Sequence, residues 1–125
     1  MLSVQNLIEK AVVEKERFIT VKIEQMDGEI KLRIPFAKEI EEIKEKNKGN
    51  SKLMICDLIY NCCEEPRLND NKLLEHFSCK EVPCEVVAKI FGDTITANIA
   101  EIILDEKAKE SSVTKIKNKI DAAKN

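Results

Sequence analysis

The stretch that decides the fold is Phe18–Phe36, with the sequence FITVKIEQMDGEIKLRIPF. Apolar and polar residues alternate on both sides of Asp27-Gly28, a dipeptide typical of two-residue type I′ hairpin turns. That turn predicts one apolar face, formed by the pairs Ile23–Leu32, Val21–Ile34 and Ile19–Phe36. We therefore expect a β-hairpin over about 18–35. Because two strands alone are marginal, the hairpin must pack on helices or join another strand.

The rest of the chain shows helical spacing of apolar residues. Ser3, Ser51 and Asp70 are predicted N-caps, and Pro83 suits a first helical turn. Gly92 is expected to end one helix before the next begins. The predicted helices are 3–16, 36–46, 52–63, 71–78, 83–91 and 94–107. The segment 52–63 is apolar nearly all round, which predicts a buried central helix. The predicted core is Leu53, Ile55, Leu58, Ile59, Leu73, Phe77, Ile99 and Ile102.

Length and composition fit one small, mainly helical domain. The chain has 125 residues, 43% of them hydrophobic, with 3 Gly and 3 Pro, which is too few for a turn-rich β-sandwich. We predict an α+β, mainly α fold, with the N-terminal hairpin followed by a compact bundle of about five helices over 36–106. Residues 1–106 form the single domain. Residues 107–125 hold six lysines against Glu110 and Asp121, a local charge of +4, and are expected to be a lysine-rich helix or tail.

Charge and cysteine content restrict the classes of function. The net charge of −2 gives no overall attraction for nucleic acid, and the lysine-rich end lacks aromatics for stacking on bases. No run approaches the 18 apolar residues of a membrane span, and the start lacks the pattern of a signal peptide. Five cysteines, an odd number, indicate reduced thiols in a cytosol.

The single histidine and the cysteines form the one constellation worth testing for chemistry. Structural zinc sites need converging ligand pairs, whereas adjacent Cys62 and Cys63 on a helix point about 100° apart. His76 and Cys79 lie one helical turn apart, which is more often accidental than catalytic. The paired glutamates and aspartates fit a solvated helix face better than a cleft. We therefore expect no enzyme activity, no catalytic residue, no metal and no cofactor, and interpret the cysteines as small apolar core residues.

Protein–protein contact remains as the expected function. The apolar residues Val113, Ile116 and Ile120 recur at helical spacing in the lysine-rich end and suit docking on a partner helix. Three further residues are candidate contacts, although the last two fit core positions better: Val87, Phe91 and Ile95. Self-association is left open.

The order of these pieces resembles the XkdN-like tail assembly chaperones of tailed phages and phage-like elements such as contractile bacteriocins. The resemblance covers about residues 15–106. It depends on Pro66-Arg67-Leu68-Asn69-Asp70, on the helix Pro83–Phe91 (PCEVVAKIF) and on the following Gly92-Asp93-Thr94. The five cysteines and the short lysine-rich end depart from the family pattern.

The resemblance implies a non-catalytic protein of the bacterial host cytoplasm. Such chaperones bind the long, aggregation-prone tape measure protein, with the tail tube protein as a second expected partner. They hold the tape measure protein until tube subunits polymerise around it, and they are absent from the finished particle. The alternative is a small helical adaptor or regulatory protein that binds a folded partner.

Overall fold

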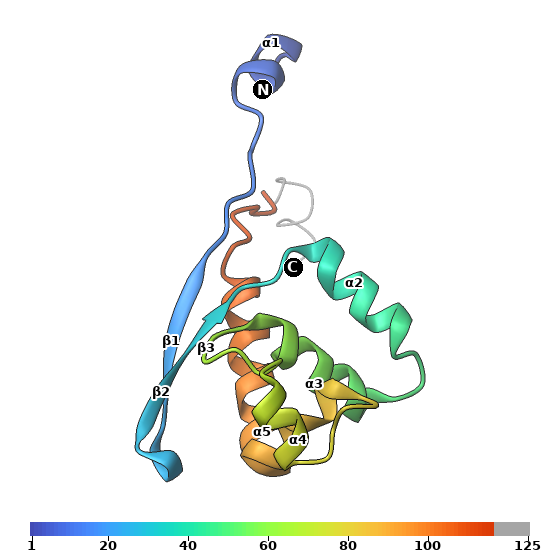
Figure 1. The fold of residues 1–125 in the computed structure, drawn as a ribbon. Coiled ribbons are helices and arrows are strands. Elements are labelled where there is room, and N and C mark those ends of the chain that lie inside the picture. Colours follow the sequence, from blue (N-terminus) through green and yellow to red (C-terminus); the bar gives the residue numbers. More distant parts are fainter. Residues whose placement is uncertain (117–125) are drawn as a thin grey trace, which may run out of the picture.

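The computed structural model describes residues 1–116 (Figure 1). Its elements confirm the predicted fold class, mainly helical with an N-terminal antiparallel hairpin. In chain order they are α1 (Val4–Glu9), β1 (Phe18–Ile23), the 3₁₀ turn η1 (Glu24–Met26), β2 (Gly28–Arg33), α2 (Ala37–Lys46), α3 (Ser51–Cys62), β3 (Cys63–Glu65), α4 (Asn71–His76), the 3₁₀ turn η2 (Pro83–Glu85) and α5 (Val86–Ala108).

The hairpin forms, but the predicted turn and register are wrong. Ile23 pairs with Gly28, and Lys22 with Glu29. The connection is the 3₁₀ turn η1, closed by Asp27 in the left-handed region (φ 48°) with its N–H donating to the Glu24 carbonyl at 3.1 Å. The predicted register would have placed Lys22 opposite Arg33, a destabilising pair of like charges. The shift involves an even number of residues, so the apolar residues keep one common face.

A third strand, which the sequence did not reveal, completes the sheet. β3 follows α3 directly and pairs antiparallel with β2, with Leu32 opposite Cys63 and Lys31 opposite Glu65. The sheet order is β1-β2-β3, so β2 is central and Leu32 is fully buried. This strand provides the additional pairing that a lone hairpin needs.

The helices α2, α3 and α4 lie where the spacing predicts them. The Asp70 carboxylate accepts hydrogen bonds from the backbone N–H groups of Lys72 and Leu73, as expected for the N-cap of α4. The cap of α3 is different from the prediction: Asn50, not Ser51, accepts from the Leu53 N–H. α3 packs against α5, α2 and η2, and Ile59 in its centre is fully buried.

The break predicted at Gly92 is present inside α5. Gly92 has φ 75° and ψ 168°, so the helix axis is interrupted between a short first half and the long second half. Only glycine adopts this backbone region readily. Pro83 occupies the first turn of η2, as predicted, and leads into α5.

One predicted core residue is not in the core. Ile102 is 39% exposed, because the second half of α5 turns Ile99 and Ile103 toward α3 instead. Leu58, Ile59 and Ile99 are buried as predicted. The remaining predicted core residues are half-buried against the same cluster: Leu53, Ile55, Leu73 and Phe77.

The N-terminal segment stands apart from this body (Figure 1). The helix predicted over 3–16 is limited to α1, which starts at the Ser3 cap and contains no buried residue. Arg17 fixes the point where the segment leaves the body. Its guanidinium donates to the Glu106 carboxylate at 2.9 Å and to the Glu106 carbonyl at 2.6 Å, near the C-terminal end of α5.

Candidate functional site

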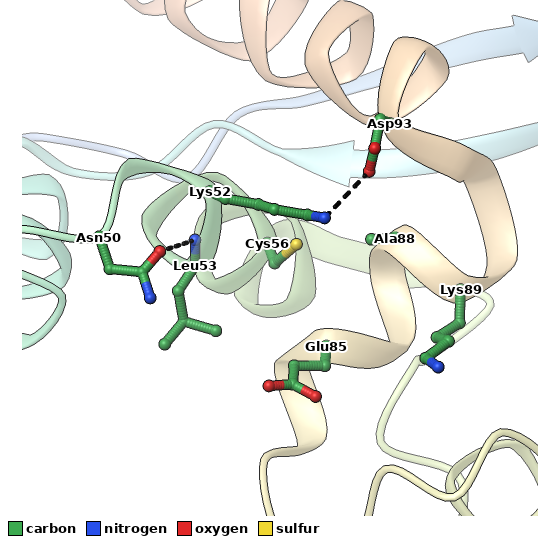
Figure 2. A pocket seen from close by; sticks show the side chains of 8 residues that line it. All are labelled: Asn50, Lys52, Leu53, Cys56, Glu85, Ala88, Lys89 and Asp93. Atoms are coloured by element: carbon green, nitrogen blue, oxygen red, sulfur yellow. Dashed lines mark hydrogen bonds and ion pairs between the residues drawn. The ribbon is translucent and has the colours of Figure 1, made fainter.

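A cavity lies between the start of α3 and the two halves of α5 (Figure 2). Its volume is about 420 Å³. A neighbouring cavity of about 260 Å³ shares four of its lining residues: Lys52, Cys56, Ala88 and Asp93. We call the two together the α3–α5 cavity. It exists because the break at Gly92 directs the second half of α5 away from the first.

The rim of the α3–α5 cavity is charged and exposed. The Lys52 ammonium reaches across to the Asp93 carboxylate at 3.4 Å (Figure 2), and both side chains are more than 70% exposed. An ion pair so exposed contributes little to stability. Glu85 and Lys89 line the same rim, and neither has an ion-pair partner within residues 1–116. Incoming charged groups of either sign can therefore be accommodated.

The floor of the cavity is less polar and contains one unsatisfied group. Cys56 and Ala88 face each other there. The Thr96 hydroxyl is buried, at 4% exposure for the residue, and has no hydrogen-bond partner within residues 1–116. A helical threonine often bonds the carbonyl four residues earlier, which here is Gly92, where the helix is broken. An unsatisfied buried hydroxyl is costly to the folded state, and this oxygen exposes almost no surface to the cavity.

The five cysteines are all free and buried. Burial raises the pKa of the Cys62 thiol to about 12 and those of Cys63 and Cys84 to about 11. Burial raises the pKa of Cys56 as well, although this thiol lies beside the α3–α5 cavity. Thiols held in the neutral form are poor nucleophiles and poor metal ligands. The interpretation of the cysteines as core residues agrees with their burial.

No group of three or more His, Cys, Asp or Glu side chains within residues 1–116 is arranged to hold a metal ion. His76 is exposed at the end of α4, with its ring edge-on to Phe77. No helix in the described part of the chain is both long enough and apolar enough to cross a membrane.

The residues predicted to contact a partner have different positions. Val87 is fully buried and offers no surface, which corrects that expectation, whereas Phe91, at 7% exposure, has the core position that the sequence favoured for it. Ile95 is half-buried against the core. Val113 and Ile116 are each 90% exposed, but the segment after α5 is not helical there. Ile120 lies outside the described residues.

Two sets of exposed apolar residues include members that were not predicted as contacts from the sequence. The first is the N-terminal arm, defined as residues 1–13, in which every large apolar side chain is exposed. Its members are Met1, Leu2, Val4, Leu7, Ile8, Val12 and Val13. The second set lies at the C-terminal end of α5 and in the segment after it: Ile102 and Leu104, which point to different sides of the helix, and the predicted Val113 and Ile116; we call these four the α5 patch. The spacing of Val4, Leu7 and Ile8 was visible, but it does not show whether a helix face meets the core or a partner.

Comparison with known proteins gives no relative: no protein-family model, curated protein or solved structure matches the chain significantly.

Proposed function

We propose that this chain is a tail assembly chaperone of a phage or phage-tail-like particle. It acts in the bacterial host cytoplasm, binds the tape measure protein and keeps it soluble until tube subunits polymerise around it. It is non-catalytic and does not remain in the mature particle. The choice of partner follows from the resemblance over about residues 15–106 to XkdN-like chaperones.

The observation that carries the proposal is the α5 patch. Leu104 is 46% exposed and Val113 90%, in a region where acidic and basic side chains surround the apolar ones. Exposed apolar side chains that gather into one surface mark contact sites for other proteins, so the proposal requires these residues to meet on the bound partner. A tape measure protein offers long apolar helical stripes, on which an apolar patch can dock.

Reversible binding is also consistent with this surface. The α5 patch is discontinuous along the chain, and ion pairs such as Lys109–Glu106 lie among its members. One copy is therefore expected to bind weakly, while many copies along one rod bind it effectively. Weak individual contacts allow tube subunits to displace the chaperone.

The test is co-expression of the tagged chain with the long coiled-coil protein encoded beside its gene. We expect the partner to be insoluble alone and to co-purify in the soluble fraction with this chain. A variant with Leu104→Glu and Val113→Glu should lose most of the recovered partner. The matched control is Val82→Glu, because Val82 is also exposed (38%) but lies before η2, away from the patch.

A partner that is soluble alone and fails to co-purify would overturn the proposal. The adaptor interpretation would then take its place, with a folded protein as partner. Equal loss of the partner with Val82→Glu would show that the α5 patch is not the contact surface.

A further inference from the structure

The N-terminal arm holds the apolar helix α1, none of whose side chains is buried within the described residues 1–116. Leu7 is 58% exposed and Ile8 67%, and α1 contains no buried residue. The N-terminus of the helix nonetheless has a complete capping box. The Ser3 hydroxyl accepts from the Asn6 N–H, and the Asn6 side chain accepts from the Ser3 N–H. A six-residue helix is unstable in water without packing, whatever its caps. Docking of its apolar side chains on another surface would stabilise it.

The α3–α5 cavity offers what the arm needs. Its floor beside Cys56 and Ala88 can take apolar side chains, and its rim carries Lys89 without an ion-pair partner in the described chain. Glu9 follows Leu7 and Ile8 directly, so an arm that places its apolar pair on the floor brings a carboxylate to the rim.

The geometry disfavours docking within one copy. Arg17 holds the base of the arm beside Glu106, whereas the cavity lies at Gly92, fourteen residues earlier in α5 and roughly 21 Å away along the helix. The eight residue steps from Glu9 to Arg17 span at most about 26–29 Å when fully extended. Little slack would remain to pass around the body, and the segment runs away from it (Figure 1).

We propose that the N-terminal arm of one copy docks in the α3–α5 cavity of a second copy, and that two copies exchange arms in a symmetric dimer. Leu7 and Ile8 fill the floor, and Glu9 pairs with Lys89 or Lys52 at the rim. Reciprocal exchange satisfies both arms and both cavities in a closed pair. This inference does not depend on the tape measure protein as partner, because the α5 patch is not involved.

The first measurement is the mass of the full chain by light scattering and by sedimentation, over a wide concentration range. We expect a dimer that dissociates on dilution. Two variants should each weaken it at least about tenfold, because burial of a Leu or Ile side chain is worth more than that factor in affinity. One is the arm variant, Leu7→Glu with Ile8→Glu. The other is the cavity variant Ala97→Arg, which places a large side chain on an exposed lining residue. Ala37→Arg at the exposed start of α2 is the matched control and should leave the dimer intact.

Mixing the two variants separates arm exchange from every other explanation. The arm variant retains a usable cavity, and the cavity variant retains a usable arm. We expect each to be monomeric alone and the mixture to form a one-armed heterodimer. A labelled peptide of residues 1–16 should likewise bind the arm variant and not the cavity variant.

Three results would overturn the inference. A wild-type chain that stays monomeric at the highest concentration excludes the dimer. A dimer unaffected by both variants uses another surface. Failure of the peptide to bind the arm variant, in a folded sample with wild-type circular dichroism, shows that the cavity does not take the arm.

Discussion

The helices α1 and α3 have apolar residues at similar helical spacings but opposite environments. In α3, Ile59 is fully buried and the residues around it form the centre of the core. In α1, Leu7 and Ile8 have no contact with that core and are more than half exposed. The two helices differ in exposure because of what they are connected to in the chain, not because of their amino-acid composition. α3 is followed directly by β3 and lies against α2 and α5, whereas eight residues separate α1 from β1.

The comparison shows that a stripe of apolar residues at helical spacing predicts a contact surface. It does not predict whether that surface meets the core of the same chain or another molecule. A buried stripe should be essential for the folding of one copy, and an exposed stripe should matter only when something docks on it. The four predictions below measure how sharply the packed body differs from the exposed segments, from the largest expected effect to the smallest.

The packed side of the comparison is tested most directly by Ile59→Ala in α3. Removing a fully buried isoleucine side chain leaves a cavity, and the free energy of unfolding should fall by about 2–5 kcal/mol. Chemical denaturation followed by circular dichroism measures this. The same substitution at Ile116, which is 90% exposed, should change the value by less than about 0.5 kcal/mol. Equal losses at both positions would mean that the burial assigned to α3 is wrong.

The second prediction concerns a polar group buried where α2 meets α3. Asn47, 7% exposed, donates to the Asp57 carboxylate at 2.8 Å and to the Ile43 carbonyl at 2.9 Å. Asn47→Ala removes one donor from a carboxylate that is 3% exposed, so we expect a loss of roughly 2–3 kcal/mol. The substitution is measured by the same denaturation experiment.

Asn69→Ala is the control for Asn47→Ala, because Asn69 is exposed in the loop before α4. It should be nearly neutral. If both alanine variants unfold at the same denaturant concentration, the network around Asp57 contributes nothing specific, and α2 is held to α3 by apolar contacts alone.

The third prediction tests the break in α5 that opens the α3–α5 cavity. Gly92→Ala forces a side chain into a backbone region reserved for glycine, although its Cβ would meet no atom within 4 Å. Because only backbone strain opposes it, the expected loss is roughly 1–2 kcal/mol. Gly28→Ala is the control, since that Cβ would meet the Met26 carbonyl at an ordinary 3.8 Å and no positive φ is involved. A Gly92→Ala variant as stable as the wild type would show that α5 can straighten.

The sequence predicted the helices and strands better than it predicted which of them pair or pack together. Asp70 and Gly92 were identified correctly, because an N-cap side chain and a positive φ are local requirements. The hairpin turn was misassigned because Asp27-Gly28 also suits a longer loop, in which Asp27 adopts the left-handed conformation after a 3₁₀ turn. β3 was missed since three residues at the end of a helix carry no alternation to detect.

The candidate site was predicted less well, for the same physical reason. Val87 and Phe91 lie on a helix whose buried and exposed apolar residues cannot be told apart by their spacing in the sequence. Only the packing of α5 on α3 decides that these two are buried. The α3–α5 cavity depends on the angle that Gly92 introduces, which no local pattern specifies. The exposure of the N-terminal arm depends on the ion pair between Arg17 and Glu106, which are 89 residues apart in the chain.

The smallest effect is expected at the clamp between the hairpin and α2. Both nitrogens at the end of Arg33 donate to the Glu39 carboxylate, one of them at 2.7 Å, and the Phe36 N–H donates to it at 3.1 Å. The hydrogen bond from Arg33 is the main cause that lowers the pKa of Glu39 below its usual value. Stability from this group is therefore present above the unfolded-state pKa, near 4.3, and is lost as pH falls through the lower folded-state pKa.

Glu39→Gln isolates that contribution. At neutral pH the variant should be less stable than the wild type by about 1 kcal/mol, since the pair is only partly buried. The difference should narrow as pH falls below about 4.3, because the wild-type side chain then becomes neutral as well. Glu41→Gln, on the exposed face of the same helix, removes the same charge without the arginine and should show a much smaller difference. Thermal unfolding of the three proteins between pH 7 and pH 3 measures both values. A constant difference between the wild type and Glu39→Gln across that range would mean that the ionised Glu39 does not hold the hairpin to α2, and that the apolar contacts of the sheet fix it there.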